Sequence, residues 1–244
     1  MLHRGWFPDS IEGERVILRR HAPDNLAAFQ RWYSDPDVAR LTRYQEGPMS
    51  GAEIERFFRT RVLDEGSLAL AIHVRATNRL IGTCALSQLD GDNGSALFHI
   101  TIGEKDAWGQ GYGTEATELM LRHAFERLRL HRLALSVFAF NERGIRSYRK
   151  VGFVLEGRAR EAIWRDGRFW DELQMSLLGH EWAARHAVSL SDGKMPWAES
   201  APGADSASGA GSLSDSPRDG STAEAATKGS AQATGRDAVG EPRR

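Results

Sequence analysis

Trp108 to Ala116 reads WGQGYGTEA, a stretch with a glycine at every second position, Gly109, Gly111 and Gly113, directly before a good helix start. An apolar, strand-like run at residues 97–103 precedes it. Glycine leaves its N–H uncovered and tolerates positive φ, so such a loop can wrap around a phosphate. The N-terminus of the following helix adds unpaired N–H groups and the positive end of its dipole. We call residues 108–114 the cradle and predict that they bind an anion, best a pyrophosphate.

The glycine spacing alone is also typical of a tight turn. The dinucleotide fingerprint needs glycine at the first, third and sixth places, and counting from Gly109 puts Thr114 at the sixth. Counting from Gly111 puts Ala116 there, which is a permitted variant, but no early βαβ unit surrounds it. A P-loop would need Gly-Lys-Ser/Thr, which the chain lacks. Nucleotide binding is therefore the less favoured interpretation.

A second motif, NERGIRSYRKVGF, occupies residues 141–153. Together the two motifs resemble the GNAT superfamily of acetyl-CoA-dependent N-acetyltransferases. The similarity is closest to the branch of ribosomal-protein N-terminal acetyltransferases and spermidine N-acetyltransferases, and it spans most of residues 14–182. Trp108 departs from the Arg or Gln with which many members begin this loop. Beyond 108–116, the matching residues are Asn141, Tyr148, Lys150, Gly152, Phe153, Glu156, Gly157 and the turn Asp166-Gly167-Arg168.

Composition limits the class of protein. The chain has 244 residues, a formal net charge of −1 and 41% hydrophobic residues, which is typical of a soluble globular protein and argues against bulk binding to nucleic acid. Its single cysteine, Cys84, excludes an internal disulfide and a multi-cysteine metal site, and its apolar neighbours favour burial. We expect no metal, no membrane span and a cytoplasmic location. Because the composition becomes rich in Ser, Ala and Gly, we predict one domain over residues 1–188 and a disordered low-complexity tail over 189–244.

The apolar periodicity predicts a mixed α/β fold, with a sheet of six or seven strands and helices on both faces. Expected strands lie at 14–20, 68–74, 80–89, 96–103, 132–140 and from 153 onward; expected helices include 114–128, 141–151 and one opened by a capping box at Ser50 and Glu53.

The family resemblance implies more than periodicity can. It implies that the strand before the cradle and the strand from residue 132 splay apart, and that acetyl-CoA, the cosubstrate, lies between them. Its pantetheine would pair with the backbone near Ile100, Thr101 and Ile102. The other implied contacts to the coenzyme are Trp108, Gly109, Gln110, Gly111, Tyr112, Gly113, Thr114 and Asn141.

Acetyl transfer to an amine needs a neutral amine, a polarised thioester carbonyl and a proton donor for the departing thiolate. Tyr148 is our candidate donor, because it lies two helical turns beyond Asn141 and matches the family's usual general acid. A free tyrosine has a pKa near 10 and a thiol one near 8.5, so the hydroxyl is better described as a hydrogen-bond donor than as a full acid. The alternative is an aromatic side chain that only packs on the core.

The sequence does not identify the general base, and three candidates stay open. Some family members carry a Glu where this chain has Ser136, which cannot serve. His99 alternates with Ile100 and should point to the opposite sheet face, which makes it one candidate. Glu104, expected to be a solvated carboxylate at the strand end, is a second, and an ordered water relay is a third.

The acceptor follows from the same chemistry. At pH 7 an α-amine with a pKa near 8 is about 10% neutral, whereas a lysine or polyamine amine near 10.4 is below ~0.1%. Because the sequence has no dense acidic cluster, we expect a protein or peptide N-terminus or a small amine, acetylated by direct attack in a ternary complex. The alternatives are a spermidine-type polyamine acetyltransferase and a non-catalytic acyl-CoA-binding or sensing module, against which Tyr148 argues. A second copy of the chain, forming a homodimer, is a further possible partner.

Overall fold

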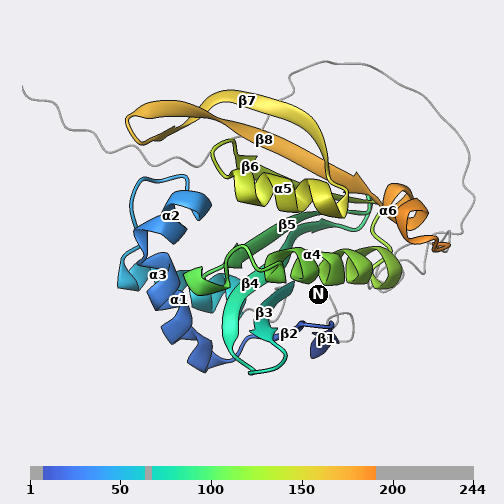
Figure 1. Cartoon of the computed structure of the whole chain (residues 1–244), viewed down its shortest axis with the longest axis horizontal. Helices are drawn as coiled ribbons and strands as arrows, with labels where there is room; N and C mark the ends of the chain where they lie inside the picture. The colour runs from blue at the N-terminus through green and yellow to red at the C-terminus, as the bar shows by residue number, and fades with distance from the viewer. Residues whose placement is uncertain (1–7, 64–67, 191–244) are drawn as a thin grey trace, which may run out of the picture. The chain divides into compact units, whose positions relative to one another are not determined.

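The computed structural model describes residues 8–63 and 68–190. Within these ranges an eight-stranded mixed sheet runs in the order β1-β2-β3-β4-β5-β6-β8-β7 (Figure 1). The strands are β1 (Ser10–Glu12), β2 (Val16–Arg20), β3 (Leu68–Val74), β4 (Leu80–Asp90), β5 (Ser95–Ile102), β6 (Arg132–Phe138), β7 (Val154–Arg165) and β8 (Arg168–Leu178). This is one strand more than predicted. The extra strand is β1, whose three residues are too short to show an alternating pattern.

Six α-helices accompany the sheet in the described ranges: α1 (Leu26–Tyr33), α2 (Pro36–Thr42), α3 (Gly51–Phe57), α4 (Tyr112–Arg122), α5 (Glu142–Val151) and α6 (Gly179–His186). The predicted capping box opens α3, where the Glu53 N–H donates to the Ser50 hydroxyl at 3.3 Å and the Glu53 carboxylate accepts from the Ser50 N–H at 2.8 Å. The predicted helix at 114–128 begins two residues early, and its second half, His123–Arg127, is π-helical.

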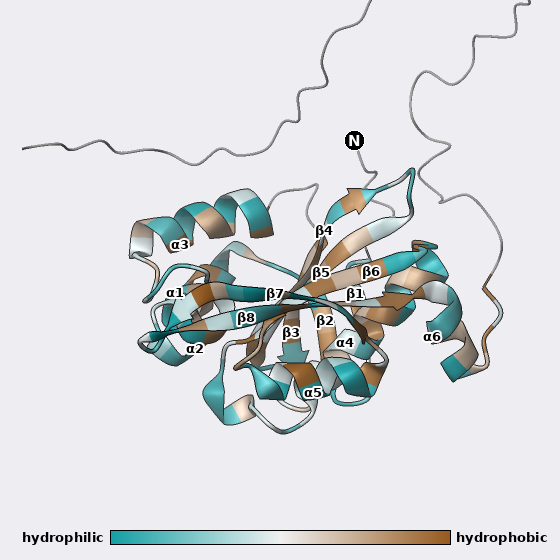
Figure 2. Ribbon diagram, turned by 90° about the horizontal axis from the view of Figure 1, so that it is seen from above, coloured by the Kyte–Doolittle hydropathy of each residue, from teal (hydrophilic) through white to brown (hydrophobic). Residues whose placement is uncertain are grey.

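The side chains of each strand alternate between two cores. On β3, Leu68 and Leu70 belong to the core beneath α4, α5 and α6, whereas Ala69 belongs to the core beneath α1 and α3. Helices therefore cover both faces, as predicted. Figure 2 shows the hydrophobic strands β5 and β6 at the centre, with helices of mixed hydropathy around them.

The two central strands, β5 and β6, are the only parallel neighbours in this sheet of described strands. They pair only where Ser95–Leu97 faces Arg132–Ala134. Beyond Leu97 and Ala134 the two strands diverge, which confirms the predicted splay.

The division into a domain over 1–188 and a disordered tail over 189–244 stays a prediction, because residues 191–244 lie outside the described residues. None of the helices in the described ranges is long and apolar enough to span a bilayer.

Candidate functional site

The backbone of the cradle is exposed at its glycines. Gly109 has a φ of +76° and Gly111, the N-cap of α4, one of +87°. The bond from the Glu115 N–H to the Gly111 carbonyl, at 3.1 Å, is the first of the helix. The N–H groups of Tyr112, Gly113 and Thr114 consequently have no acceptor inside α4. A Cβ added at Gly109 would meet no atom within 4 Å, so its backbone is open to a ligand.

The start of β2 holds the cradle in place. One oxygen of Glu115 accepts the N–H groups of Arg15 and Val16 at 2.8 and 3.2 Å. In return the Arg15 guanidinium donates to the Gln110 carbonyl at 2.9 Å and lies 4.5 Å from the centre of the Tyr112 ring. Arg15 was not predicted, because nothing local in the sequence connects it with a loop 95 residues away.

A second unpredicted arginine lies at the first residue of the cradle. The Arg143 guanidinium lies 3.9 Å from the centre of the Trp108 ring, and desolvation lowers its pKa, although an arginine of this kind stays charged at neutral pH. In the part of the chain that the structure describes, no carboxylate forms an ion pair with it. Arg15 and Arg143 therefore place two positive charges against residues of the cradle, Arg15 at Gln110 and Tyr112 and Arg143 at Trp108.

Beyond Leu97, the edge of β5 that faces the splay has backbone N–H and C=O groups that do not pair with β6. The Gly103 N–H donates to the Ile81 carbonyl at 2.9 Å, so by strand alternation the Thr101 backbone also faces β4, whereas Ile100 and Ile102 face the opening. The Ile102 carbonyl already accepts the Trp108 indole N–H at 2.6 Å. Of the three residues predicted to pair with pantetheine, Ile100 thus offers the most accessible backbone. Trp108, which stands where many family members have Arg or Gln, uses its indole N–H for this bond to Ile102.

Tyr148 lies on α5, on the same side of the sheet as the cradle helix. Asn141 caps α5 as predicted, its side-chain oxygen accepting the Gly144 N–H at 3.0 Å. The Tyr148 ring is half-buried, packs edge-on against Phe153 at 5.9 Å, and burial raises the pKa of its hydroxyl to about 12. Within the described residues this hydroxyl has no hydrogen-bond partner. The Thr114 and Ser147 hydroxyls, 2.9 Å apart, join the cradle helix to α5 beside it.

His99 points to the other sheet face, as predicted. The residue as a whole is exposed, and its Nε2 lies 2.7 Å from the Ser87 hydroxyl. The ring is nevertheless partly desolvated, which lowers its pKa. A neutral imidazole can accept a proton, so the geometry is compatible with a base on the side opposite Tyr148. Ser136 is exposed on β6 and has no basic atom, as the sequence indicated.

Glu104 differs from its prediction. Its carboxylate accepts the Trp32 indole N–H at 2.8 Å and pairs with Arg31 at 3.0 Å, and only 26% of the side chain is exposed. It is thus a structural tie between β5 and α1 rather than a solvated carboxylate. The partners lie more than 70 residues upstream, where a local pattern could not indicate them.

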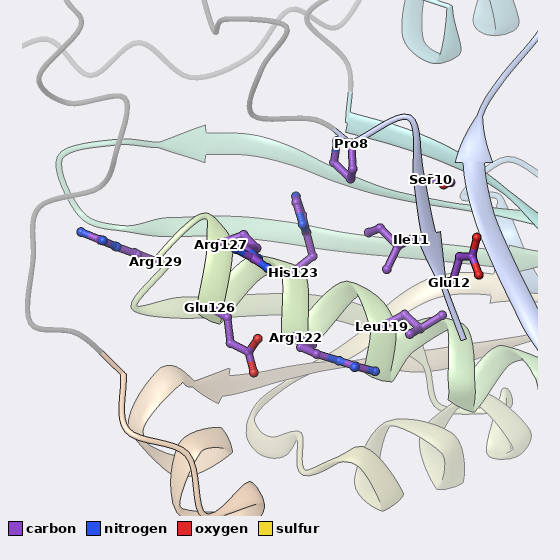
Figure 3. Close-up of a pocket in the computed structure, with 10 residues that line it drawn as sticks. All are labelled: Pro8, Ser10, Ile11, Glu12, Leu119, Arg122, His123, Glu126, Arg127 and Arg129. Atoms are coloured by element: carbon purple, nitrogen blue, oxygen red, sulfur yellow. The ribbon is translucent and has the colours of Figure 1, made fainter. Parts of the chain in front are cut away.

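A cavity of about 860 Å³ lies elsewhere, between β1 and the C-terminal end of the α4 segment (Figure 3). It contains none of the predicted site residues. No group of three or more metal-ligating side chains is present in the described ranges. The lining residues of the cavity are Pro8, Ser10, Ile11, Glu12, Leu119, Arg122, His123, Glu126, Arg127 and Arg129.

Comparison with known proteins agrees with this geometry. Residues 15–154 match the family model described as acetyltransferase (GNAT) domain. The chain is 26% identical to the uncharacterized N-acetyltransferase p20 of Bacillus licheniformis over 72% of this chain and 99% of that protein. It is 27% identical to a spermidine N(1)-acetyltransferase of Escherichia coli (strain K12), over 71% and 87%. The crystal structure of a spermidine N-acetyltransferase from Vibrio cholerae in complex with CoA and spermine has a TM-score of 0.62 at 23% identity, over 70% and 99%.

Proposed function

The chain belongs to the GNAT acetyltransferase family and is an N-acetyltransferase, and on that premise we propose that it moves the acetyl group of acetyl-CoA to a primary amine by direct attack in a ternary complex. The observation that carries this proposal is the divergence of β5 and β6 beyond Leu97 and Ala134, beside the N-terminus of α4. A gap between strands with free N–H groups at one end suits a long thioester that carries a diphosphate. The solved relative bound to CoA has the same fold, which supports the choice of cosubstrate.

We expect different residues around the gap to bind different parts of the coenzyme. The N–H groups of the cradle, with Arg15 and Arg143 beside them, would hold the diphosphate. The open backbone of Ile100 would pair with the pantetheine amide.

The chemistry needs no covalent intermediate on the enzyme. The amine nitrogen attacks the thioester carbonyl, the C–S bond breaks, and the thiolate leaves while the Tyr148 hydroxyl donates a hydrogen bond to it. The proton lost by the amine passes to His99 or to water on the other face. Cys84 is 1% exposed and its burial raises the pKa of its thiol, so it is a poor nucleophile.

A release assay for the free thiol of CoA tests this function. The panel contains peptides with free N-termini, polyamines, aminoglycosides and amino acids. We expect at least one primary amine to release thiol faster than spontaneous hydrolysis, with a rate that rises from pH 7 to 9 as the amine loses its proton. Tight binding of CoA with no stimulation by any amine would instead indicate the non-catalytic acyl-CoA-binding module.

Replacement of Arg143 by alanine should weaken binding of CoA by about tenfold, the size expected for one lost contact to a charged group, with little effect on kcat. Titration calorimetry with CoA measures it. Arg146→Ala is the matched control, because Arg146 lies on the same helix but already pairs with Glu142 at 3.1 Å. Equal losses in the two variants would remove Arg143 from the diphosphate site.

A further inference from the structure

The sheet face opposite Tyr148 carries polar side chains near the wide end of the splay. Leu173 and Met175 on β8 are buried in the core beneath α5, so Glu172 and Gln174 point to the other face, where His99 also lies. Glu172 pairs in register with Phe138, the last residue of β6. An acceptor that approaches the gap from this face would meet the Glu172 carboxylate.

Tyr44, in the loop between α2 and α3, reaches across to this carboxylate. Its hydroxyl donates a hydrogen bond to Glu172, and its ring packs edge-on against Phe138 with centroids 5.3 Å apart. Burial of the hydroxyl and the neighbouring carboxylate raise the pKa of Tyr44 to about 12, so it stays a neutral donor. The buried Arg165 fixes this loop by donating to the Arg43 carbonyl at 2.6 Å.

Unlike Asp166, Asp171 and Glu104, Glu172 forms no ion pair with a described residue. Asp166 pairs with Arg40, Asp171 pairs with Arg158 at 3.1 Å, and Glu104 pairs with Arg31. Glu172 has only the neutral Tyr44 hydroxyl among the residues that the structure describes, although its side chain is partly buried. A carboxylate in such surroundings is stabilised by an incoming positive charge.

We infer that Glu172 and Tyr44 form a subsite for a second positive charge on the acceptor, so that the enzyme favours acceptors with another amino group over monoamines. This rests on the proposed function. The reacting amine must be neutral, and a carboxylate in contact with it would hold its proton; a second ammonium group has no such conflict. The Tyr44 ring, which is 61% exposed and whose hydroxyl contacts the carboxylate, suits an organic ammonium group.

The position of the subsite suits an ammonium group that is separate from the reacting amine. Glu172 is opposite Phe138, four residues beyond Ala134, where β5 and β6 last pair. At the strand rise this is about 13 Å along β6. The subsite therefore lies away from the point where the strands part, toward the wide end of the gap.

Three acceptors that differ only in their far end test the inference: hexylamine, 1,6-diaminohexane and 6-aminohexanoate. With the wild-type enzyme we expect kcat/KM for the diamine, corrected for its two equivalent ends, to exceed that for hexylamine by about two- to fivefold, the upper part of the range of an exposed ion pair. The amino acid should be the poorest. Glu172→Gln should abolish the preference and leave hexylamine unchanged.

Glu161→Gln is the matched control, because it removes the same charge from an exposed position on β7 and should retain the preference. Equal rates for the three acceptors in the wild type, or a preference that survives Glu172→Gln, would overturn the inference. So would an equal loss for all acceptors, which would mean a structural role. A preference for 6-aminohexanoate would point instead to Arg165, whose Nε and Nη1 are buried without a hydrogen-bond partner among the described residues. If no amine in this series or in the wider panel is acetylated, the proposed function itself fails.

Discussion

Replacement of Gly109 by valine is expected to weaken binding of CoA by at least about tenfold, because even one lost hydrogen bond to a charged group has this effect. The reason is local. Gly109 has a φ of +76°, which a β-branched residue adopts only with strain, and its Cβ would project into space that is empty to 4 Å. If that space receives the diphosphate, the valine side chain displaces it. Titration calorimetry with CoA measures the change.

Gly167→Val separates this effect from loss of stability. Gly167 lies in the turn between β7 and β8, with a φ of +73° and equally open surroundings. Both variants should therefore lower the melting temperature by similar amounts, since both strain the same kind of backbone. Only Gly109→Val should lose affinity for CoA. A comparable loss in both variants would show that the cradle has no special part in binding.

Replacement of Tyr148 by phenylalanine should lower kcat by at least about tenfold, a floor set below the ~10²–10⁴-fold that a positioned proton donor typically contributes, while the Kd for CoA stays nearly unchanged. The ring still packs against Phe153, so the fold keeps its core contact. Steady-state kinetics with a saturating amine, together with the Kd for CoA, measure the two effects separately.

The pH profile gives a second test of Tyr148. Because its pKa is raised to about 12, the hydroxyl is protonated at every pH below that value and is lost as a donor only above it. The wild-type rate should therefore not fall between pH 8 and 10 through titration of this group. Unaltered turnover in Tyr148→Phe would mean that Tyr148 only packs on the core.

Local patterns predicted those parts of the fold and the site whose causes are local. The glycines before α4, the capping box at Ser50 and the Asn141 cap each act within a few residues, and the structure contains them. The helix α2 was missed although Asp35 followed by Pro36 is a recognisable N-terminal signal, with the Asp35 carboxylate accepting the Asp37 N–H at 2.8 Å.

The rest depends on contacts between distant residues. Tyr44 and Glu172 are 128 residues apart, and only the folded sheet brings the loop after α2 onto β8. Likewise, the splay of β5 and β6 leaves no trace in the periodicity of either strand, and its prediction came from the family resemblance.

A crystal structure of the protein with bound CoA would show whether the cradle holds the diphosphate. We expect diphosphate oxygens within about 3.2 Å of main-chain nitrogens between Gly109 and Thr114, the ordinary range of an N–H to oxygen hydrogen bond. A complex in which CoA is bound elsewhere, while these N–H groups contact no part of it, would rule out the cradle as the diphosphate site.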